Sequence, residues 1–320
     1  MRVLLSSIFF FLFICESLLS QTERFVMPSD KKQLTVVTEP PTLYKGFLKT
    51  GLSYSHGFLY DYFNDDGKKE KSLGSLSAQS WFFLLSAQYG ISDRLEVNVN
   101  IPYLRSTTNM SLDMEFPLFD STATRIWSNK TSGISDIYFG FRYQLIAGDI
   151  VKPYLTLAMT ATMPTAEKNP TNIIDENNYD GAPGTGEPKL AVDLNFKKIF
   201  YPFAFVSTLS YTRYFGGEKF LEPFQEPSAF NSGNLWLGYG GLSFHLNDWI
   251  VFTNEFIYSH KGELEIEGEG DGIKYMNFTY HPYLYFQINH LRVVQSVEIP
   301  LWGRYTSADP GYIFMVQYIF

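Results

Sequence analysis

Three stretches of this chain alternate strictly between apolar and polar residues, and this pattern constrains the fold more than any other feature. In 94–103, apolar or aromatic residues occupy every odd position, whereas Arg94, Glu96 and two asparagines occupy even ones. The stretches 136–145 and 189–197 repeat the pattern. A repeat of two residues places successive side chains on opposite faces of a β-strand, while an amphipathic helix repeats about every 3.6. These stretches are therefore predicted to be strands with one apolar and one polar face.

Weaker stretches of the same alternation fill most of the remaining chain. Together with the three regular stretches they bring the predicted strands to twelve. The weaker stretches are 46–58, 75–90, 153–164, 202–214, 234–246, 250–260, 273–288, 291–301 and 311–320.

The connections between these strands alternate between short and long. The short ones are 90–93, 147–152, 198–201, 247–249 and 289–290. The others, nearly all longer, are 59–74, 105–132, 165–187, 215–233, 261–272 and 302–310. A soluble β-sandwich gives no reason for this alternation, whereas a barrel in an outer membrane combines short periplasmic turns with long extracellular loops.

Composition supports a membrane barrel. Aromatic residues make up 18% of the chain, yet after the first residues no run reaches the ~18 apolar residues that a spanning helix requires. Strands can cross a membrane only as a closed barrel, because closure pairs every backbone group. We therefore predict an all-β fold, a transmembrane antiparallel β-barrel of about twelve strands, surrounded by the lipid of a bacterial outer membrane. The net charge of −8 argues against nucleic-acid binding.

The start of the chain is typical of an exported protein. Met1 and Arg2 give a positive end, residues 3–14 form a short apolar core, and a polar, small-residue exit follows. This core is too short to span a membrane and indicates a cleaved signal peptide, with cleavage after Ser20 favoured. The predicted parts are a signal peptide at 1–20, a periplasmic N-terminal segment at 21–44 and the barrel at 45–320.

Cys15 is the only cysteine, and it offers the alternative of a lipid-modified N-terminus. The bulky Ile14 before it fits lipid-modification signals poorly. If Cys15 leaves with the signal peptide, the mature chain has no disulfide and no thiolate metal site.

The last predicted strand ends on an aromatic residue at the C-terminus. Such a strand is similar to the signal that the barrel-assembly machinery recognises, so this machinery is a predicted partner. The alternating apolar positions that make up the predicted assembly signal are Tyr312, Phe314, Val316, Tyr318 and Phe320.

The same alternation predicts which charged residues face the lumen. Two readings stay open: these charges form ion pairs that rigidify a narrow barrel, or they line a solute path and tune its selectivity. A cross-strand pair between Glu96 and Arg142 is expected from their similar depth on neighbouring strands. The predicted lumen-facing charges are Arg94, Glu96, Asp136, Arg142, Lys189, Asp193, Arg292 and Glu298.

No catalytic or metal motif emerges from the sequence. The five histidines lack metal-ligand spacing, so no metal site and no cofactor are predicted. Ser55-His56 and Ser259-His260 lie near the predicted extracellular rim, but adjacent residues on a strand point to opposite faces. An acidic loop at 263–271 lacks the ligand spacing of a calcium loop and is read as a charged surface loop.

Several of these stretches resemble an outer-membrane family labelled as the MetA pathway of phenol degradation, often called simply a transporter. The resemblance implies an outer-membrane barrel suspected of moving aromatic or hydrophobic small molecules, and it implies no catalytic residues. The family's usual Pro-Thr-Gly is Pro164-Thr165-Ala166 here, which makes that match less specific. The matching stretches are 90–97 running on to 101–103, 133–140, 163–165 and 184–186.

The predicted function is passive passage of a small solute, aromatic or hydrophobic, through a monomeric or weakly oligomeric barrel. The alternative is a structural or surface-interaction protein with a closed lumen, whose loops 105–132 and 165–187 are functional. An outer-membrane enzyme is the third hypothesis, and the chain is expected not to be one.

Overall fold

The computed structural model describes residues 42–71, 77–116, 121–148, 151–169, 171–175, 178–219, 228–247 and 249–320. The predicted signal peptide, both sites proposed for its processing, and residues 21–41 of the N-terminal segment lie outside this part of the chain. No helix among the described residues is long and apolar enough to cross a membrane.

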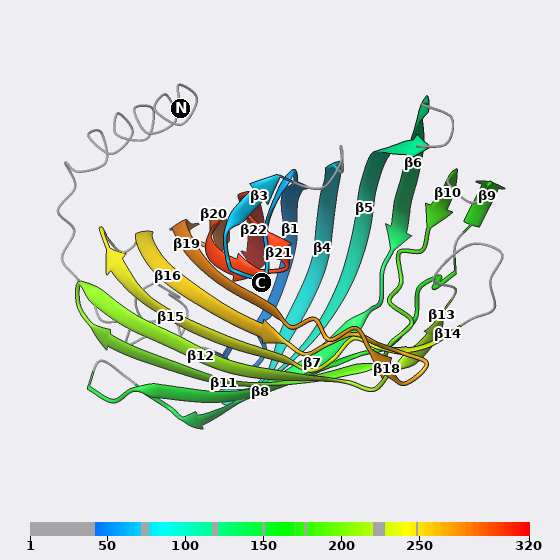
Figure 1. Ribbon diagram of the computed structural model, residues 1–320. Coiled ribbons are helices and arrows are strands. Elements are labelled where there is room, and N and C mark those ends of the chain that lie inside the picture. The colour runs from blue at the N-terminus through cyan, green and yellow to red at the C-terminus, as the bar shows by residue number, and fades with distance from the viewer. Residues whose placement is uncertain are drawn as a thin grey trace. The chain divides into compact units, whose positions relative to one another are not determined.

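Twelve antiparallel strands form a closed barrel (Figure 1). Neighbours in the barrel are also neighbours among the barrel strands in sequence, and closure occurs where β1 pairs with β22. Each of the twelve predicted strands corresponds to one of them, so the predicted fold class is confirmed. The barrel strands are β1 (Leu48–Leu59), β4 (Ser77–Ser92), β5 (Leu95–Phe116), β7 (Tyr138–Ile146), β8 (Tyr154–Thr162), β11 (Lys189–Phe200), β12 (Phe203–Tyr214), β15 (Leu235–His245), β16 (Ile250–Lys261), β19 (Tyr275–Ile288), β20 (Leu291–Arg304) and β22 (Gly311–Ile319).

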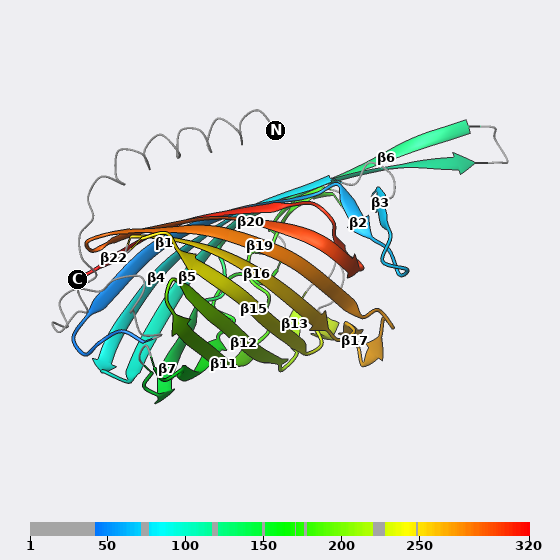
Figure 2. The same ribbon diagram turned by 90° about the vertical axis from the view of Figure 1, so that its left-hand side faces the viewer.

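The longest connection is not the loop that the sequence predicted at 105–132. Strand β5 continues beyond its barrel neighbours and pairs with β6 (Ser121–Ile134), so the two form a hairpin that projects from the barrel (Figure 2). Two short strands, β9 (Thr171–Asp175) and β10 (Asn178–Gly181), extend the sheet from β6. The prediction failed here because five successive polar residues at 105–109 interrupt the alternation, which resumes only at Met110.

The other long connections form two small sheets. One contains β13 (Gly217–Lys219), β14 (Ser228–Asn231), β17 (Glu265–Ile266) and β18 (Glu269–Gly270). The other contains β2 (Asp61–Phe63), β3 (Lys69–Lys71) and β21 (Thr306–Ser307). We call the end of the barrel that carries these connections the long-loop rim, and the opposite end the short-turn rim.

Alternation decides what each face of the barrel presents. Outward side chains are large, apolar and exposed, as at Leu85 (54% exposed) and Leu209 (64%). Inward side chains are polar or small, and many are buried. An apolar outer surface around a polar interior suits a strand wall in contact with lipid, because lipid tails cannot satisfy polar groups.

Candidate functional site

The lumen has two different halves. In the half near the short-turn rim, the described inward side chains are packed against one another and are almost inaccessible to solvent. Thr156 is 0% exposed, and Ile199 and Ile319 are each 1% exposed. Other buried inward residues of this half are Lys49, Gln144, Tyr154, Ala158, Ala204, Ser243, His245, Val251, Thr253, Gln287, Arg292, Val294 and Ser296.

A segment that precedes β1 lies inside this half. Thr42 and Leu43 are 1% and 2% exposed. The Leu43 N–H donates a hydrogen bond to Glu96 Oε2 (2.9 Å), and the Thr42 hydroxyl donates one to Gln144 Oε1 (3.2 Å). The described end of the predicted 21–44 segment, residues 42–44, therefore belongs to the barrel interior.

Gly90 on β4 makes room for this segment. A Cβ atom at this position would lie 2.1 Å from the Tyr44 carbonyl oxygen, far inside van der Waals contact. The backbone of the segment can thus cross the inner wall only because residue 90 has no side chain. The glycine that the sequence placed in a short turn has a packing role that its spacing did not reveal.

The predicted pair of Glu96 and Arg142 forms across β5 and β7. The two residues are direct partners in the strand register, and Glu96 Oε1 lies 3.3 Å from Arg142 Nη1. The Glu96 side chain is 1% exposed and the Arg142 side chain 32% exposed. A buried carboxylate without such partners would be costly, so the ion pair and the Leu43 N–H together make its burial tolerable.

Arg292, on β20, makes contacts with two other strands in the same half of the lumen. Its guanidinium donates to Gln287 Oε1 (3.1 Å) and to Gln317 Oε1 (3.5 Å). Its Cζ atom lies 5.0 Å from the centre of the Tyr285 ring. These contacts link β19, β20 and β22 inside the barrel.

The half near the long-loop rim contains a cavity of about 810 Å³. It is lined mainly by hydroxyl, amide and charged side chains of β7, β8, β11, β12, β15 and β16. Strand register places them in rows, such as Asn195, Thr208 and Tyr239 across three neighbouring strands. The lining residues are Tyr138, Thr160, Thr162, Lys189, Ala191, Asp193, Asn195, Thr208, Ser210, Thr212, Tyr214, Leu235, Leu237, Tyr239 and Glu255.

The three charged side chains that line this cavity differ in their contacts with the protein. Lys189 Nζ lies 5.3 Å from the centre of the Tyr214 ring. Glu255 Oε2 lies 3.2 Å from His281 Nδ1. Asp193 makes no hydrogen bond or ion pair with any residue that the structure describes. A half-buried carboxylate without a partner is available to a solute.

Glu298 lines a second cavity of about 420 Å³, which reaches the long-loop rim between β1, β4, β19, β20 and β22. Its neighbours there include Asn277, Thr279, Ser307 and Asp309. The walls of both cavities combine hydroxyl, amide and charged groups with a larger area of apolar surface. Leaving a buried hydroxyl unpaired costs about 1–3 kcal/mol in proteins, so an occupant with hydrogen-bonding groups is favoured at the polar part of the wall.

Two of the predicted lumen charges lie outside the barrel strands. Arg94 is in the turn before β5, and its side chain is exposed. Strand β5 begins at Leu95, one residue later than the alternation predicted.

Asp136 is 3% exposed, but it lies in the connection before β7 and binds loop backbone. Its Oδ2 accepts from the Thr185 N–H and the Thr185 hydroxyl, each at 2.7 Å. Its Oδ1 accepts from the Ala166 N–H at 3.2 Å. Asp136 therefore fastens both ends of the connection between β8 and β11.

Sequence reasoning missed Glu187, which is 0% exposed and lies just before β11. Its Oε1 accepts a hydrogen bond from the Ser232 N–H at 2.9 Å, so it joins two long connections. The partner is 45 positions away in the chain, and no local pattern signals such a contact.

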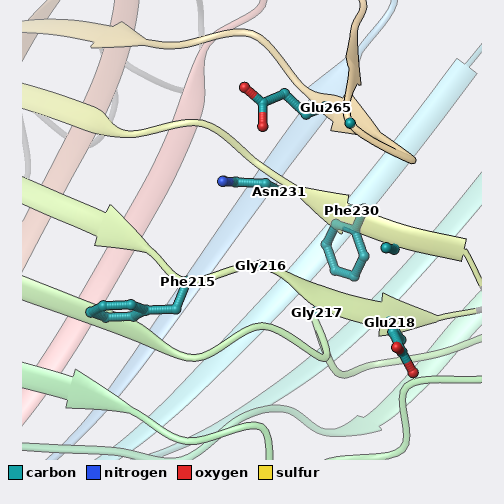
Figure 3. Close-up of a pocket in the computed structure, with 9 residues that line it drawn as sticks. Phe215, Gly216, Gly217, Glu218, Phe230, Asn231 and Glu265 are labelled. Carbon is teal, nitrogen blue, oxygen red and sulfur yellow. The ribbon is translucent and has the colours of Figure 1, made fainter.

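A third pocket of about 370 Å³ lies among the small strands β13, β14 and β17 (Figure 3). Phe230, 6% exposed, lies across it, and the carboxylates of Glu218 and Glu265 belong to its wall. Part of the acidic stretch 263–271 is folded here into β17 and β18. Among the described residues, no group of three or more His, Cys, Asp or Glu side chains is placed to hold a metal ion.

The two Ser-His pairs considered for catalysis are divided by the wall. Ser55 and Ser259 fall on the inward face, whereas His56 and His260 fall on the outward face. His56 stacks on Trp81 with ring centres 5.2 Å apart.

The five positions of the predicted assembly signal all point outward on β22 and beyond its end. Tyr312, Phe314 and Tyr318 are 43–44% exposed, and Phe320 is 61% exposed. The Phe320 N–H donates to the Leu48 carbonyl at 2.7 Å, so the last residue still pairs with the first strand. Its recognition by the assembly machinery stays a prediction.

No protein-family model matches the chain, and no curated protein matches it. The resemblance to the MetA-pathway family therefore stays a prediction. Among solved structures, the barrel is similar to an outer membrane channel from Pseudomonas putida F1, with a TM-score of 0.67 and 12% identity over 92% of this chain and 100% of that one. The translocator domain of the autotransporter NalP from Neisseria meningitidis matches with a TM-score of 0.47 and 11% identity, covering 86% of this chain and 88% of that one. The similarity to the first of these establishes a shared outer-membrane-type barrel fold.

Proposed function

We propose that this chain is an outer-membrane barrel that lets small solutes pass passively through its lumen. The observation that carries the proposal is the cavity of about 810 Å³ on the long-loop side, where polar side chains and apolar surface meet. The apolar outer wall and the shared fold with an outer membrane channel support the location. Outer-membrane lipid and the barrel-assembly machinery are the partners that this location requires.

The chemistry of the cavity narrows the class of solute. Three tyrosines offer ring faces, while threonines, Ser210 and Asn195 offer hydrogen bonds. A solute that carries a ring and hydrogen-bonding groups satisfies both, whereas a hydrocarbon leaves the hydroxyl groups unpaired. We therefore propose a small amphipathic solute that carries a ring, a narrower class than the aromatic or hydrophobic molecules that the family resemblance implies.

Passage also requires the short-turn half to open. Thr42, Leu43 and the inward side chains around them fill that half, so the segment at 42–44 must move before a solute can cross.

Liposome swelling and single-channel recording test this proposal with the full-length protein and a Gly90→Val variant. The valine side chain conflicts with the Tyr44 carbonyl and displaces the segment, so flux of small amphipathic solutes is expected to rise. Gly240→Val on β15 is the matched control, because nothing lies within 4 Å of a Cβ atom there. The absence of flux in the folded wild type and in folded Gly90→Val would overturn the proposal.

The packed short-turn half also favours a second candidate, a closed barrel whose long connections are the functional surface. The small sheets and the projecting β5–β6 hairpin would then bind a surface ligand. Removal of that hairpin or of residues 165–187 that abolishes ligand binding, with permeability unchanged, would favour this candidate.

A further inference from the structure

A row of outward side chains near the long-loop rim combines an imidazole, an indole and a guanidinium. His56, Trp81 and Arg105 are direct partners in the register of β1, β4 and β5. The His56 and Trp81 rings are stacked at 10° with centres 5.2 Å apart. The Arg105 Cζ atom lies 5.6 Å from the centre of the same indole. Trp81 thus has cationic or titratable neighbours on both sides.

A second row lies at the same rim on other strands. Register places Trp236, His260, Met276 and Arg304 side by side across β15, β16, β19 and β20. The Arg304 Cζ atom lies 6.0 Å from the centre of the Trp302 ring.

Arg213, on β12, completes the pattern. Its Cζ atom lies 5.5 Å from the centre of the Phe215 ring. Three exposed arginines at separate points of the wall, Arg105, Arg213 and Arg304, are therefore each stacked against an aromatic side chain. We call these three residues the arginine belt.

The arginine belt has no anionic partner among the described residues. None of its guanidinium groups forms an ion pair or a side-chain hydrogen bond with another residue that the structure describes. Each guanidinium carbon lies over an aromatic ring at 5.5–6.0 Å, and a guanidinium can bind a phosphate through two parallel hydrogen bonds. Cations that are orientated in this way and lack a carboxylate are suited to an external anion.

We propose that the arginine belt binds the phosphate groups of a phosphorylated glycolipid in the leaflet at the long-loop rim. Aromatic side chains at the edge of the apolar band lie at the depth of lipid headgroups, so the stacked arginines reach headgroup phosphates. His56 and His260 lie in the same rows as two of the arginines, with Trp81 and Met276 between them. This inference rests on the proposed membrane location and is independent of solute passage.

The test uses the full-length protein in phosphatidylcholine vesicles, with and without bisphosphorylated lipid A. The variant Arg105→Gln/Arg213→Gln/Arg304→Gln removes the belt. A control, Lys45→Gln/Arg94→Gln/Lys152→Gln, removes as many exposed positive charges at the other rim. Retention of lipid A by the purified barrel is expected to fall about tenfold or more in the belt variant and to stay near the wild-type value in the control.

Two further measurements test whether the guanidinium groups bind the phosphates of the lipid. Arg→Lys at all three positions keeps the charge but loses the paired hydrogen bonds, and it should retain an intermediate amount of lipid A. Lipid A without phosphates should bind the wild type and the belt variant equally. Equal retention of bisphosphorylated lipid A by the folded wild type and the folded belt variant would overturn the proposal. Stabilisation of the wild type by inorganic phosphate alone, to the same extent, would also overturn it, because the site would then take a free anion.

Discussion

The carboxylate of Glu96 on β5 lies 3.3 Å from the guanidinium of Arg142 on β7, and its other oxygen accepts the Leu43 N–H at 2.9 Å. One buried side chain therefore connects the barrel wall to the segment that fills the short-turn half. We therefore expect removal of this charge to affect both the stability and the permeability of the barrel.

Glu96→Ala is expected to loosen the segment at 42–44 and to lower the free energy of unfolding by about 1–3 kcal/mol, because Leu43 and Arg142 each lose a partner. Urea titration in detergent measures the stability change, and single-channel recording should show more frequent opening. Glu96→Gln keeps an acceptor for the Leu43 N–H and should have a smaller effect. Equal effects of the two variants would show that the hydrogen bond to Leu43 does not hold the segment.

Asp136→Ala should release the connection between β8 and β11, because three hydrogen bonds from Ala166 and Thr185 are lost. Hydrogen bonds to a charged group contribute about 1.5–3 kcal/mol each, so local opening becomes far more frequent. Limited proteolysis should cut within 163–187 faster in this variant, and Thr185→Val should give an intermediate rate. Asp65→Ala, an exposed acid in another long connection, is the control.

Asp193→Asn should reduce the preference of the lumen for cations. In the Gly90→Val background, the cation-to-anion permeability ratio is expected to fall roughly two- to fivefold, since about 1 kcal/mol of attraction corresponds to about fivefold. Reversal potentials in a salt gradient measure this ratio. Glu70→Gln removes an exposed carboxylate from β3, outside the lumen, and should leave the ratio unchanged.

Deletion of Phe320 should lower the yield of folded barrel, because it removes the exposed terminal ring and the hydrogen bond to the Leu48 carbonyl. Heat-modifiable migration on gels gives the folded fraction, and flux per folded molecule should stay the same. Phe200→Ala removes a similarly exposed ring (47%) from another strand and should fold normally. A loss of flux per folded molecule on deletion of Phe320 would contradict an assembly role.

The strands and their two faces could be predicted because both depend on local alternation. Glu96 and Asn100 are buried inside the wall, and Val97 and Val99 are exposed outside it, as their positions in the sequence require. The same logic predicted the partnership of Glu96 with Arg142, because register follows from turn length and alternation.

Contacts between the inner wall and segments far away in the sequence could not be predicted from alternation. Alternation placed Asp136 on the inward face but did not show that Thr185 covers it. It gave no sign that Leu43 enters the lumen, because that contact spans 53 positions in the chain. The extension of β5 was missed for another reason: the polar run 105–109 interrupts the alternation before it resumes at Met110.

The pairing of β1 with β22 also sets the order of events in biogenesis. Strand β1 has β4 as one neighbour, but its other edge has no partner until the last residues of the chain have been made. One edge of β1 therefore stays unpaired until β22 is present. The whole chain must be delivered to the membrane unfolded and protected from aggregation. For this protein, a truncated translation product is an open-edged sheet and not a smaller barrel.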